Sequence, residues 1–219
     1  MVIVMLGAQG SGKGTVGVKL AEALNIPHIS TGDIFRENIK NKTALGNEAC
    51  EYINQGMLVP DELTNRILQD RLSKEDVIKN GAVIDGYPRT DKQCEKLDDM
   101  LNEIGLSVDV AIKLDVAVEE LLQRITTRRV CKNCKEGYNT GYKPPKVEGV
   151  CDICGGEVIQ RDDDKEEAVK QRLSTYYKNE GVILEYYNKC GKLRIEKAGD
   201  LIGRNSAKVT EDLIKEFKK

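Results

Sequence analysis

VIVMLGAQGSGKGT, residues 2–15, decides how this chain folds. The apolar run from Val2 to Leu6 predicts a buried strand, and the segment that follows has the G-x-x-x-x-G-K spacing of a phosphate-binding loop. Glycines let successive backbone amides curve around a phosphate, the start of the next helix adds partial positive charge, and Lys13 adds a full charge. We therefore predict a polyphosphate site; the alternative is a glycine-rich turn without a ligand.

Short apolar runs recur along the chain, separated by longer stretches of helical pattern. This alternation is typical of a parallel sheet wrapped by helices, so we predict an α/β protein with three α/β/α layers and a central parallel five-stranded sheet. The expected strands are residues 2–6, 28–29, 82–84, 108–114 and 193–195. The expected helices include residues 14–24, 61–72, 118–126 and 166–188.

Two stretches interrupt this alternation and are expected to be insertions on the core. Residues 30–60 carry a helical pattern without a strong strand, and residues 130–160 are rich in Gly, Pro, Cys and Lys without helical periodicity. The second insertion is therefore expected to be loop-like. We expect the Asp61 carboxylate to cap a helix N-terminus and the Asn80-Gly81 pair to stop a helix.

Size and charge limit the possible functions. The 219 residues suffice for one α/β core with small insertions, but not for two large domains. A formal net charge of −2 gives no general attraction for nucleic acid or an anionic membrane, so an anion would need a local cluster of arginines. With no basic leader, cleavage site or membrane-length apolar run, we expect a cytoplasmic protein that binds neither nucleic acid nor membrane.

Four of the seven cysteines have the spacing C-x2-C-x16-C-x2-C: Cys131, Cys134, Cys151 and Cys154. This spacing is typical of tetrahedral zinc sites, and four thiolates leave no open position, so the zinc would be structural. A redox dithiol and a zinc ribbon that grips nucleic acid are the alternatives, the second because lysines lie nearby in the sequence.

The isolated cysteines and the single histidine are expected to be structural. Cys50, Cys94 and Cys190 are interpreted as small buried or half-buried apolar side chains. His28 lies in the second expected strand, between Pro27 and Ile29. It is not expected to be catalytic.

Several segments resemble those of adenylate kinases, within the nucleoside monophosphate kinases. These are G-K-G-T at 12–15, S-T-G-D-I-F-R at 30–36, L-V-P-D at 58–61, D-G-Y-P-R-T at 85–90 and R-R-V at 128–130. Together they cover nearly the whole chain at matching spacing. The resemblance implies reversible transfer of the γ-phosphoryl group of Mg·ATP to AMP, which gives two ADP.

The resemblance implies a role for each matching residue. Those implied to bind ATP are Gly7, Gly10, Ser11, Gly12, Lys13, Gly14, Thr15, Arg124 (stacked on the adenine), Arg128, Gly137, Tyr138 and Gly203. Those implied to bind AMP are Thr31, Arg36, Met57, Leu58, Val59, Gly86, Tyr87, Pro88, Arg89, Gln93, Arg161 and Arg172. The charges implied to be catalytic are Lys13, Arg36, Arg89, Arg128, Arg161 and Arg172.

The chemistry of these residue types agrees with the implied roles. Planar arginine forks suit a phosphate dianion, and the Gln93 amide can both donate to and accept from an adenine edge. Mg²⁺ would be held mainly by phosphates and water, with Asp85 steadying the water shell.

The resemblance also implies a division of the chain and its partners. Residues 1–29, 60–126 and 165–219 would form a core, 30–59 an insertion that binds the nucleoside monophosphate, and 127–164 a zinc-clipped lid of the long-form bacterial type. The family suggests a monomer whose partners are ATP, AMP and ADP.

Two other functions remain open. One is a UMP/CMP kinase or an enzyme that uses GTP as donor, although pyrimidine-specific relatives usually carry Asn in place of Thr90 and Gln93. The other is a non-catalytic nucleotide-binding module, with RNA at the zinc loop.

The chain also departs from the family pattern. Gln9 stands where the family normally has proline, and Val182 where a Thr-Ala-Pro segment is typical, so both positions are expected to relax the backbone. Residues 196–205 lack the usual Asp-Gly turn, which affects the adenine contact assigned to Gly203.

Overall fold

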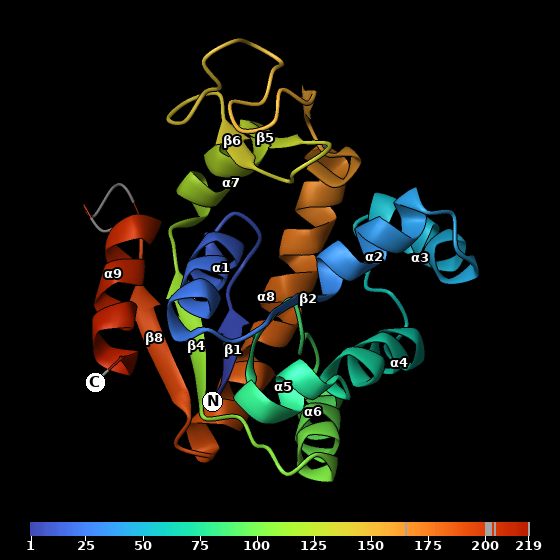
Figure 1. Ribbon diagram of the computed structural model, residues 1–219, viewed down its shortest axis with the longest axis vertical. Coiled ribbons are helices and arrows are strands. Elements are labelled where there is room, and N and C mark those ends of the chain that lie inside the picture. Colours follow the sequence, from blue (N-terminus) through green and yellow to red (C-terminus); the bar gives the residue numbers. More distant parts are fainter. Residues whose placement is uncertain (165, 200–202, 204, 219) are drawn as a thin grey trace.

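A parallel sheet lies between two layers of helices in the computed structural model, which describes residues 1–164, 166–199, 203 and 205–218 (Figure 1). The sheet has five strands in the order β2-β3-β1-β4-β8. They are β1 (Val2–Leu6), β2 (His28–Ser30), β3 (Ala82–Asp85), β4 (Val110–Asp115) and β8 (Leu193–Lys197). The predicted fold class and all five strands are confirmed, although β4 begins at residue 110 rather than 108.

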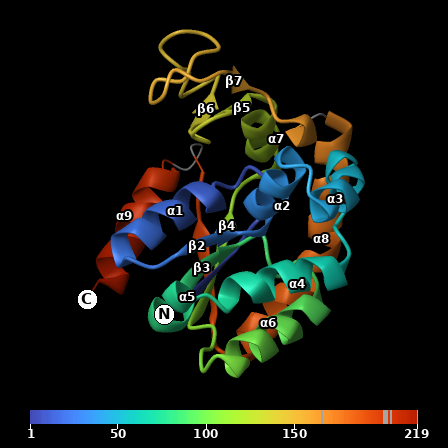
Figure 2. The same ribbon diagram turned by 45° about the vertical axis from the view of Figure 1, so that its right-hand side comes forward.

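The central strand β1 explains why helices cover both faces. Its side chains alternate, so that Val2, Val4 and Leu6 pack in one cluster while Ile3 and Met5 pack in another. The first cluster includes side chains of α4 (Asp61–Leu72), α6 (Asp91–Glu103) and α8 (Glu166–Lys189). The second includes side chains of α1 (Lys13–Leu24) and α9 (Ser206–Phe217), which lie together beyond the other face (Figure 2).

The first insertion is helical, as expected. It contains α2 (Thr31–Lys40) and α3 (Ala44–Asn54), which pack on the start of α4 through a small apolar cluster of their own. After α4, α5 (Glu75–Asn80) ends at Gly81, whose φ of 84° with a ψ of −158° is a conformation open mainly to glycine and one that cannot continue the helix. The predicted stop at Asn80-Gly81 is therefore confirmed.

The capping role predicted for Asp61 is wrong. Asp61 is the first residue of α4, and Pro60 holds the cap position without a side-chain hydrogen bond. The Asp61 carboxylate instead accepts a hydrogen bond from Gln93 Nε2 at 2.6 Å. A contact across two helices has replaced the local one.

The second insertion is more regular than the loop that we expected. It follows α7 (Val118–Thr126) and contains an antiparallel sheet in the order β6-β5-β7. The strands are β5 (Arg128–Cys131), β6 (Gly137–Asn139) and β7 (Val158–Ile159), and a 3-10 turn, η1 (Asp162–Asp164), leads back to α8. Strands of two to four residues carry too little pattern to be recognised in the sequence.

The isolated cysteines differ in exposure. Cys94 is buried and Cys50 half-buried, as predicted, but Cys190 is exposed, because it follows α8 where the chain turns toward β8. His28 lies on β2 as expected. None of the helices in the described part of the chain combines the length and apolar character needed to cross a lipid bilayer.

Candidate active site

The glycine loop lies at the carboxyl end of β1 and runs directly into α1. Gly12 occupies the N-cap position of α1 with a φ of 92°, a conformation that favours glycine, and as a glycine it has no side chain to cap the first turn. The Ser11 hydroxyl is buried, and within the described residues it has no hydrogen-bond partner. The loop therefore has the geometry of an anion site at a helix N-terminus.

Lys13 is the first residue of α1, and its Nζ lies 3.4 Å from the carbonyl oxygen of Ala8, within the loop. Its pKa is lowered from 10.5 to about 8, chiefly by burial; the Asp85 carboxylate raises it, and the charges of Arg89 and Arg172 lower it. A positive charge held among other positive charges is expected where a polyphosphate is to bind.

Two pockets adjoin, and the glycine loop lines the first of them. The first is lined by Gln9 and Lys13 of the loop and by side chains of α8, and the second lies between α2, α4 and the segment after β3. Gly86, Arg89 and Arg172 line both pockets. The carboxyl ends of the parallel strands β1, β2 and β3 meet at this edge, which places the loop beside the segments that begin at Thr31 and Gly86.

The second pocket collects most of the residues assigned to AMP. It is lined by Thr31, Arg36, Met57, Leu58, Val59, Gly86, Arg89, Gln93 and Arg172. Sequence reasoning missed further lining residues, namely Gly32, Phe35, Ile53, Gly56, Thr64 and Asp163. Gly32 and Phe35 lie within the segment at 30–36 without having been given a role, and the other four belong to none of the quoted segments. Pro88 lines the first pocket instead.

The Gln93 side chain is buried, and both ends of its amide are hydrogen-bonded. Its Oε1 accepts from the backbone amide of Arg89 at 2.7 Å, and its Nε2 donates to Asp61. Tyr87, also assigned to AMP, points its ring into the core and donates its hydroxyl hydrogen to Asn65 Oδ1 at 2.7 Å. Only its backbone could then face a ligand.

The predicted arginines converge, and carboxylates of η1 hold several of them. Arg172 Nη1 lies 2.6 Å from Asp163 Oδ2, and Arg36 Nη1 lies 3.7 Å from the same atom. Although burial opposes ionisation, the charges of Arg172 and Arg36 hold the pKa of Asp163 below its usual value. Internal carboxylates therefore balance this positive charge.

Arg128 is held in the same way by the second carboxylate of η1. Its Nε donates to Asp164 Oδ2 at 2.8 Å, and its Nη2 donates to Asp164 Oδ1. The importance of the two η1 carboxylates was missed, because their sequence, adjacent to Arg161, says nothing about which distant arginines they meet.

Arg89 and Arg161 are the other members of the cluster. Arg89 Nε donates to the carbonyl oxygen of Gly86 at 2.7 Å. Burial, together with the charge of Arg172, lowers the pKa of Arg89 to about 10, and burial with the charge of Arg36 does the same for Arg161. Both remain positive at neutral pH.

Arg124 and Gly203 are the next two residues assigned to ATP. Arg124 is buried, with its Nη2 2.5 Å from Glu120 Oε1 and its Nη1 3.4 Å from the carbonyl oxygen of Gly10. It thus lies against the glycine loop. Gly203 lies in a turn with a φ of 65°, and its neighbours 200–202 and 204 lie outside the described residues.

Asp85 ends β3 beside the glycine loop and is buried. Its Oδ1 has no hydrogen-bond partner among the residues that the structure describes, and its Oδ2 faces Gly14 closely enough that a Cβ there would lie 3.3 Å away. A buried carboxylate oxygen of this kind fits the water shell of a hydrated Mg²⁺, whose waters donate hydrogen bonds.

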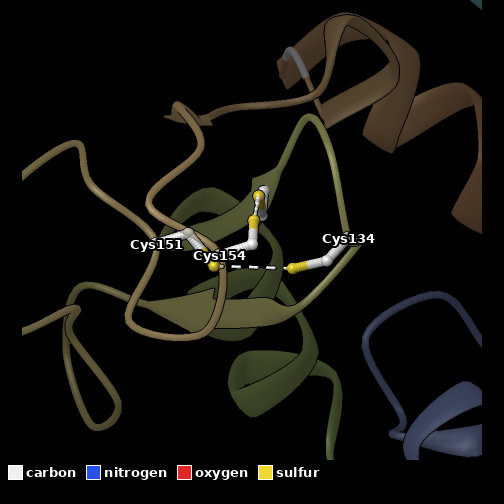
Figure 3. Close-up of side chains that lie close together, drawn as sticks. Cys134, Cys151 and Cys154 are labelled. Atoms are coloured by element: carbon white, nitrogen blue, oxygen red, sulfur yellow. Dashed lines mark hydrogen bonds between the residues drawn. The ribbon is translucent and has the colours of Figure 1, made fainter.

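The four clustered cysteines meet in the second insertion. Their sulfur atoms all lie within 4.8 Å of one another, and Figure 3 shows Cys134, Cys151 and Cys154 pointing together. A tetrahedral zinc ion with bonds of about 2.3 Å requires sulfur atoms about 3.8 Å apart, so the set fits zinc. Burial opposes ionisation of Cys151, but hydrogen bonds from the Tyr138 hydroxyl and backbone amides lower its pKa to about 6.

The Tyr138 side chain belongs to this cysteine cluster. It is buried, donates to Cys151 Sγ at 3.3 Å, and accepts from the backbone amide of Asp152 at 2.7 Å. A contact of Tyr138 with ATP would therefore involve its backbone, as would any contact of Gly137.

A glycine loop that opens a helix, a lysine and converging arginines around two adjoining pockets define a phosphotransferase of the P-loop class. Comparison with known proteins narrows the class, since the family model described as adenylate kinase matches residues 5–192. The chain belongs to the adenylate kinase family.

Several adenylate kinases are similar to this chain over most of their length. An adenylate kinase of Acetivibrio thermocellus is 54% identical over 193 residues, 88% of each chain. Adenylate kinases of Caldicellulosiruptor bescii and Ruminiclostridium cellulolyticum are 47% and 48% identical over 213 residues, which cover 97% of this chain and 99% of each relative.

Proposed function

We propose that this chain transfers the γ-phosphoryl group of Mg·ATP to AMP and catalyses the reverse reaction from two ADP. The observation that carries the proposal is the convergence of Lys13, which lines the first pocket, with Arg89 and Arg172, which line both. AMP would occupy the pocket lined by Thr31 and Gln93, and the ATP phosphates would lie on the glycine loop. The family match supports this choice of nucleotides.

Catalysis in this proposal is alignment and charge stabilisation. The transferred group spreads negative charge over its oxygens in a loose transition state, which Lys13, Arg36, Arg89, Arg128, Arg161 and Arg172 would stabilise. The acceptor is a phosphate oxygen whose second pKa lies near 6, so it is largely ionised at pH 7 and needs no general base. His28, on β2, has no part in the reaction.

For AMP to bind as proposed, Gln93 must exchange partners. Its amide holds Asp61 and the Arg89 backbone, so reading an adenine edge requires one of these bonds to open or to be shared. These two hydrogen bonds give both ends of the buried Gln93 amide a partner and fix the orientation of the amide.

The two metals would have different roles. Mg²⁺ bound with ATP neutralises the phosphate oxygens, and Asp85 would orient its water shell. Zinc would be structural, held by Cys131, Cys134, Cys151 and Cys154, and would close the loops of the second insertion.

The division of labour along the chain is also a proposal. Residues 1–29, 60–126 and 165–219 would be the core, 30–59 the insertion that closes on AMP, and 127–164 the lid that closes on ATP. Closure excludes water, which would otherwise accept the phosphoryl group. We further propose that the protein acts as a cytoplasmic monomer.

The direct test is turnover with a panel of nucleotides. ADP formation is measured by coupled assay from ATP with AMP, GMP, UMP or CMP, and from GTP with AMP, over a titration of Mg²⁺. The proposal expects rapid turnover for ATP with AMP alone. Preference for a pyrimidine acceptor or for GTP would contradict the assignment of substrates, and absence of turnover would contradict that of the reaction.

A further inference from the structure

Gln9 has a contact that its position in the glycine loop does not predict. The side chain is only 9% exposed, and its Nε2 donates to Asp164 Oδ1 at 2.9 Å. Asp164 is the last residue of η1 and is itself 1% exposed. A side chain of the phosphate-binding loop therefore reaches the segment that connects the lid insertion to α8.

The same carboxylate holds Arg128. Its Oδ1 accepts from both Gln9 and Arg128, and its Oδ2 accepts from Arg128 Nε. Arg128 begins β5, just after α7, whereas Asp164 lies just before α8. The chain of contacts from Gln9 to Asp164 to Arg128 thus links the glycine loop to both ends of the lid insertion.

The chemistry of the pair fixes the orientation of the Gln9 amide. Only the NH2 end can donate to a carboxylate, so the carbonyl end must face away from Asp164. Oε1 is buried and lacks a hydrogen-bond partner among the described residues. Leaving such an acceptor unpaired costs about 1–3 kcal/mol. The Gln9 amide therefore keeps its donor bond to Asp164, although its carbonyl oxygen has no partner among the described residues.

We propose that Gln9 is a positioning residue for the donor nucleotide, which acts by holding the Asp164 carboxylate in register with the glycine loop, both when Arg128 is bonded to it and when Arg128 leaves it. This inference rests on the proposed function. When Arg128 turns to the ATP phosphates, Asp164 loses its main partner, and a buried unpaired carboxylate is costly. The Gln9 amide remains bonded to Asp164 and lowers that cost.

The contact also changes what glutamine in place of proline at position 9 implies for the restraint of the glycine loop. The sequence predicts a looser loop because glutamine does not restrict φ as proline does. A hydrogen bond from the loop to a buried carboxylate restores restraint from outside the loop. The restraint is coupled to the lid, and Gln9 should therefore affect ATP more than AMP.

The sharpest test reverses the polarity of the pair. Gln9→Glu, Asp164→Asn and the double variant are compared by KM for ATP, KM for AMP, kcat, and calorimetric Kd for a non-hydrolysable Mg·ATP analogue. Gln9→Glu alone should raise KM for ATP and Kd for the Mg·ATP analogue about tenfold, since two carboxylates then face each other. It should leave KM for AMP within about twofold of the wild-type value. In the Asp164→Asn background the same change should do clearly less harm, because the amide at position 164 can donate to the carboxylate at position 9.

A matched control and a second variant complete the test. Gln160 Nε2 lies 3.4 Å from the backbone carbonyl oxygen of Asp164, not from its carboxylate, so Gln160→Glu should leave KM for ATP unchanged. Gln9→Met keeps the length but removes the donor without adding charge, so it remains informative if Gln9→Glu does not fold. It should raise KM for ATP several-fold with kcat less affected.

The outcomes separate the inference from the proposed function. Equal effects of Gln9→Glu in the two backgrounds, equal changes in KM for ATP and AMP, or a normal KM for ATP in Gln9→Met would overturn the role of Gln9. Wild-type protein that forms no ADP from ATP and AMP would instead overturn the proposed function.

Discussion

Arg172 and Asp163 form an ion pair in which Arg172 Nη1 lies 2.6 Å from Asp163 Oδ2, at the centre of the positive cluster. The same carboxylate oxygen lies 3.7 Å from Arg36 on the first insertion. Asp163 thus stands where positive charge from α2 and α8 meets. This carboxylate supplies negative charge of the kind that a phosphate would bring.

Removing that charge should destabilise the ligand-free protein. Asp163→Asn leaves two partly exposed guanidinium groups facing each other, so we expect the free energy of unfolding to fall by about 1–2 kcal/mol at pH 7. Urea denaturation measures this, with Asp70→Asn as the control because Asp70 only pairs with Lys74 on the surface. Equal stability of Asp163→Asn and wild type would contradict the prediction.

The Asp163 contribution should also depend on pH. The folded-state pKa is lowered, so the stabilisation is fully present above the unfolded value of about 3.9 and is lost as pH falls through the folded value. The difference in stability between wild type and Asp163→Asn should therefore shrink below pH 4. A difference that stays constant down to pH 2 would rule out this ionisation as its source.

Arg89→Ala should abolish most of the activity while leaving the fold intact. Arg89 lines both pockets, and loss of one donor to a developing anionic charge costs about 10²- to 10³-fold in kcat. The comparison is Arg71→Ala, which removes an arginine that pairs with Asp76 on the surface. Turnover and circular dichroism are measured on both. An unchanged rate in Arg89→Ala would exclude Arg89 from the site.

Lys13 should make nucleotide binding depend on pH. Its pKa of about 8 means that the free lysine loses its proton above that pH, and phosphates favour the protonated form. Affinity for Mg·ATP should therefore fall by up to about tenfold per pH unit above pH 8, with proton uptake on binding at pH 8. Calorimetry in buffers of different ionisation enthalpy measures that uptake, and Lys13→Met should abolish it.

The lowered pKa of Lys13 also has a consequence for stability. The unfolded chain binds more protons than the folded chain between pH 8 and 10.5, so this group alone makes the folded state relatively more stable as pH rises through that window. Lys13→Met should remove this rise. An identical pH dependence of unfolding in wild type and variant would contradict it.

Metal removal should affect stability more than chemistry. A cross-link closing loops of this length contributes about 3 kcal/mol, which corresponds to about 6–12 °C in Tm for a chain of this size. Chelation or Cys131→Ser should lower Tm by that amount and remove bound zinc, while most activity persists at low temperature. Cys190→Ser should change neither property, because Cys190 lies outside the cluster. Complete loss of activity without unfolding would indicate a catalytic ion.

Local pattern was enough to predict the strands and the glycine loop. β1 is a run of apolar residues followed by G-x-x-x-x-G-K, and both features report on structure within a few residues of themselves. The four-cysteine site was equally accessible, because two Cys-x-x-Cys turns at this spacing have few other uses.

Contacts between distant segments could not be predicted in this way. Asp61 has the chemistry of a helix cap, but Gln93 of α6 takes its carboxylate. Asp163 and Asp164 look like solvated acids until the fold brings Arg172 and Arg128 to them. From the sequence, Gln9 was notable only for standing where the family normally has proline. Each depends on pairing between elements, about which single-residue propensities carry no information.

β5 carries Arg128 at its first position and Cys131 at its last. The cysteine cluster and the guanidinium are therefore joined by one short extended segment whose length is fixed by its residue count. Because successive side chains of a strand point to opposite faces, inserting or deleting one residue between them would turn one group away from its partners. Replacing Arg129 or Val130 by another residue would leave the spacing between Arg128 and Cys131 unchanged. In this segment the geometry therefore depends more on the spacing of Arg128 and Cys131 than on the identity of the residues between them.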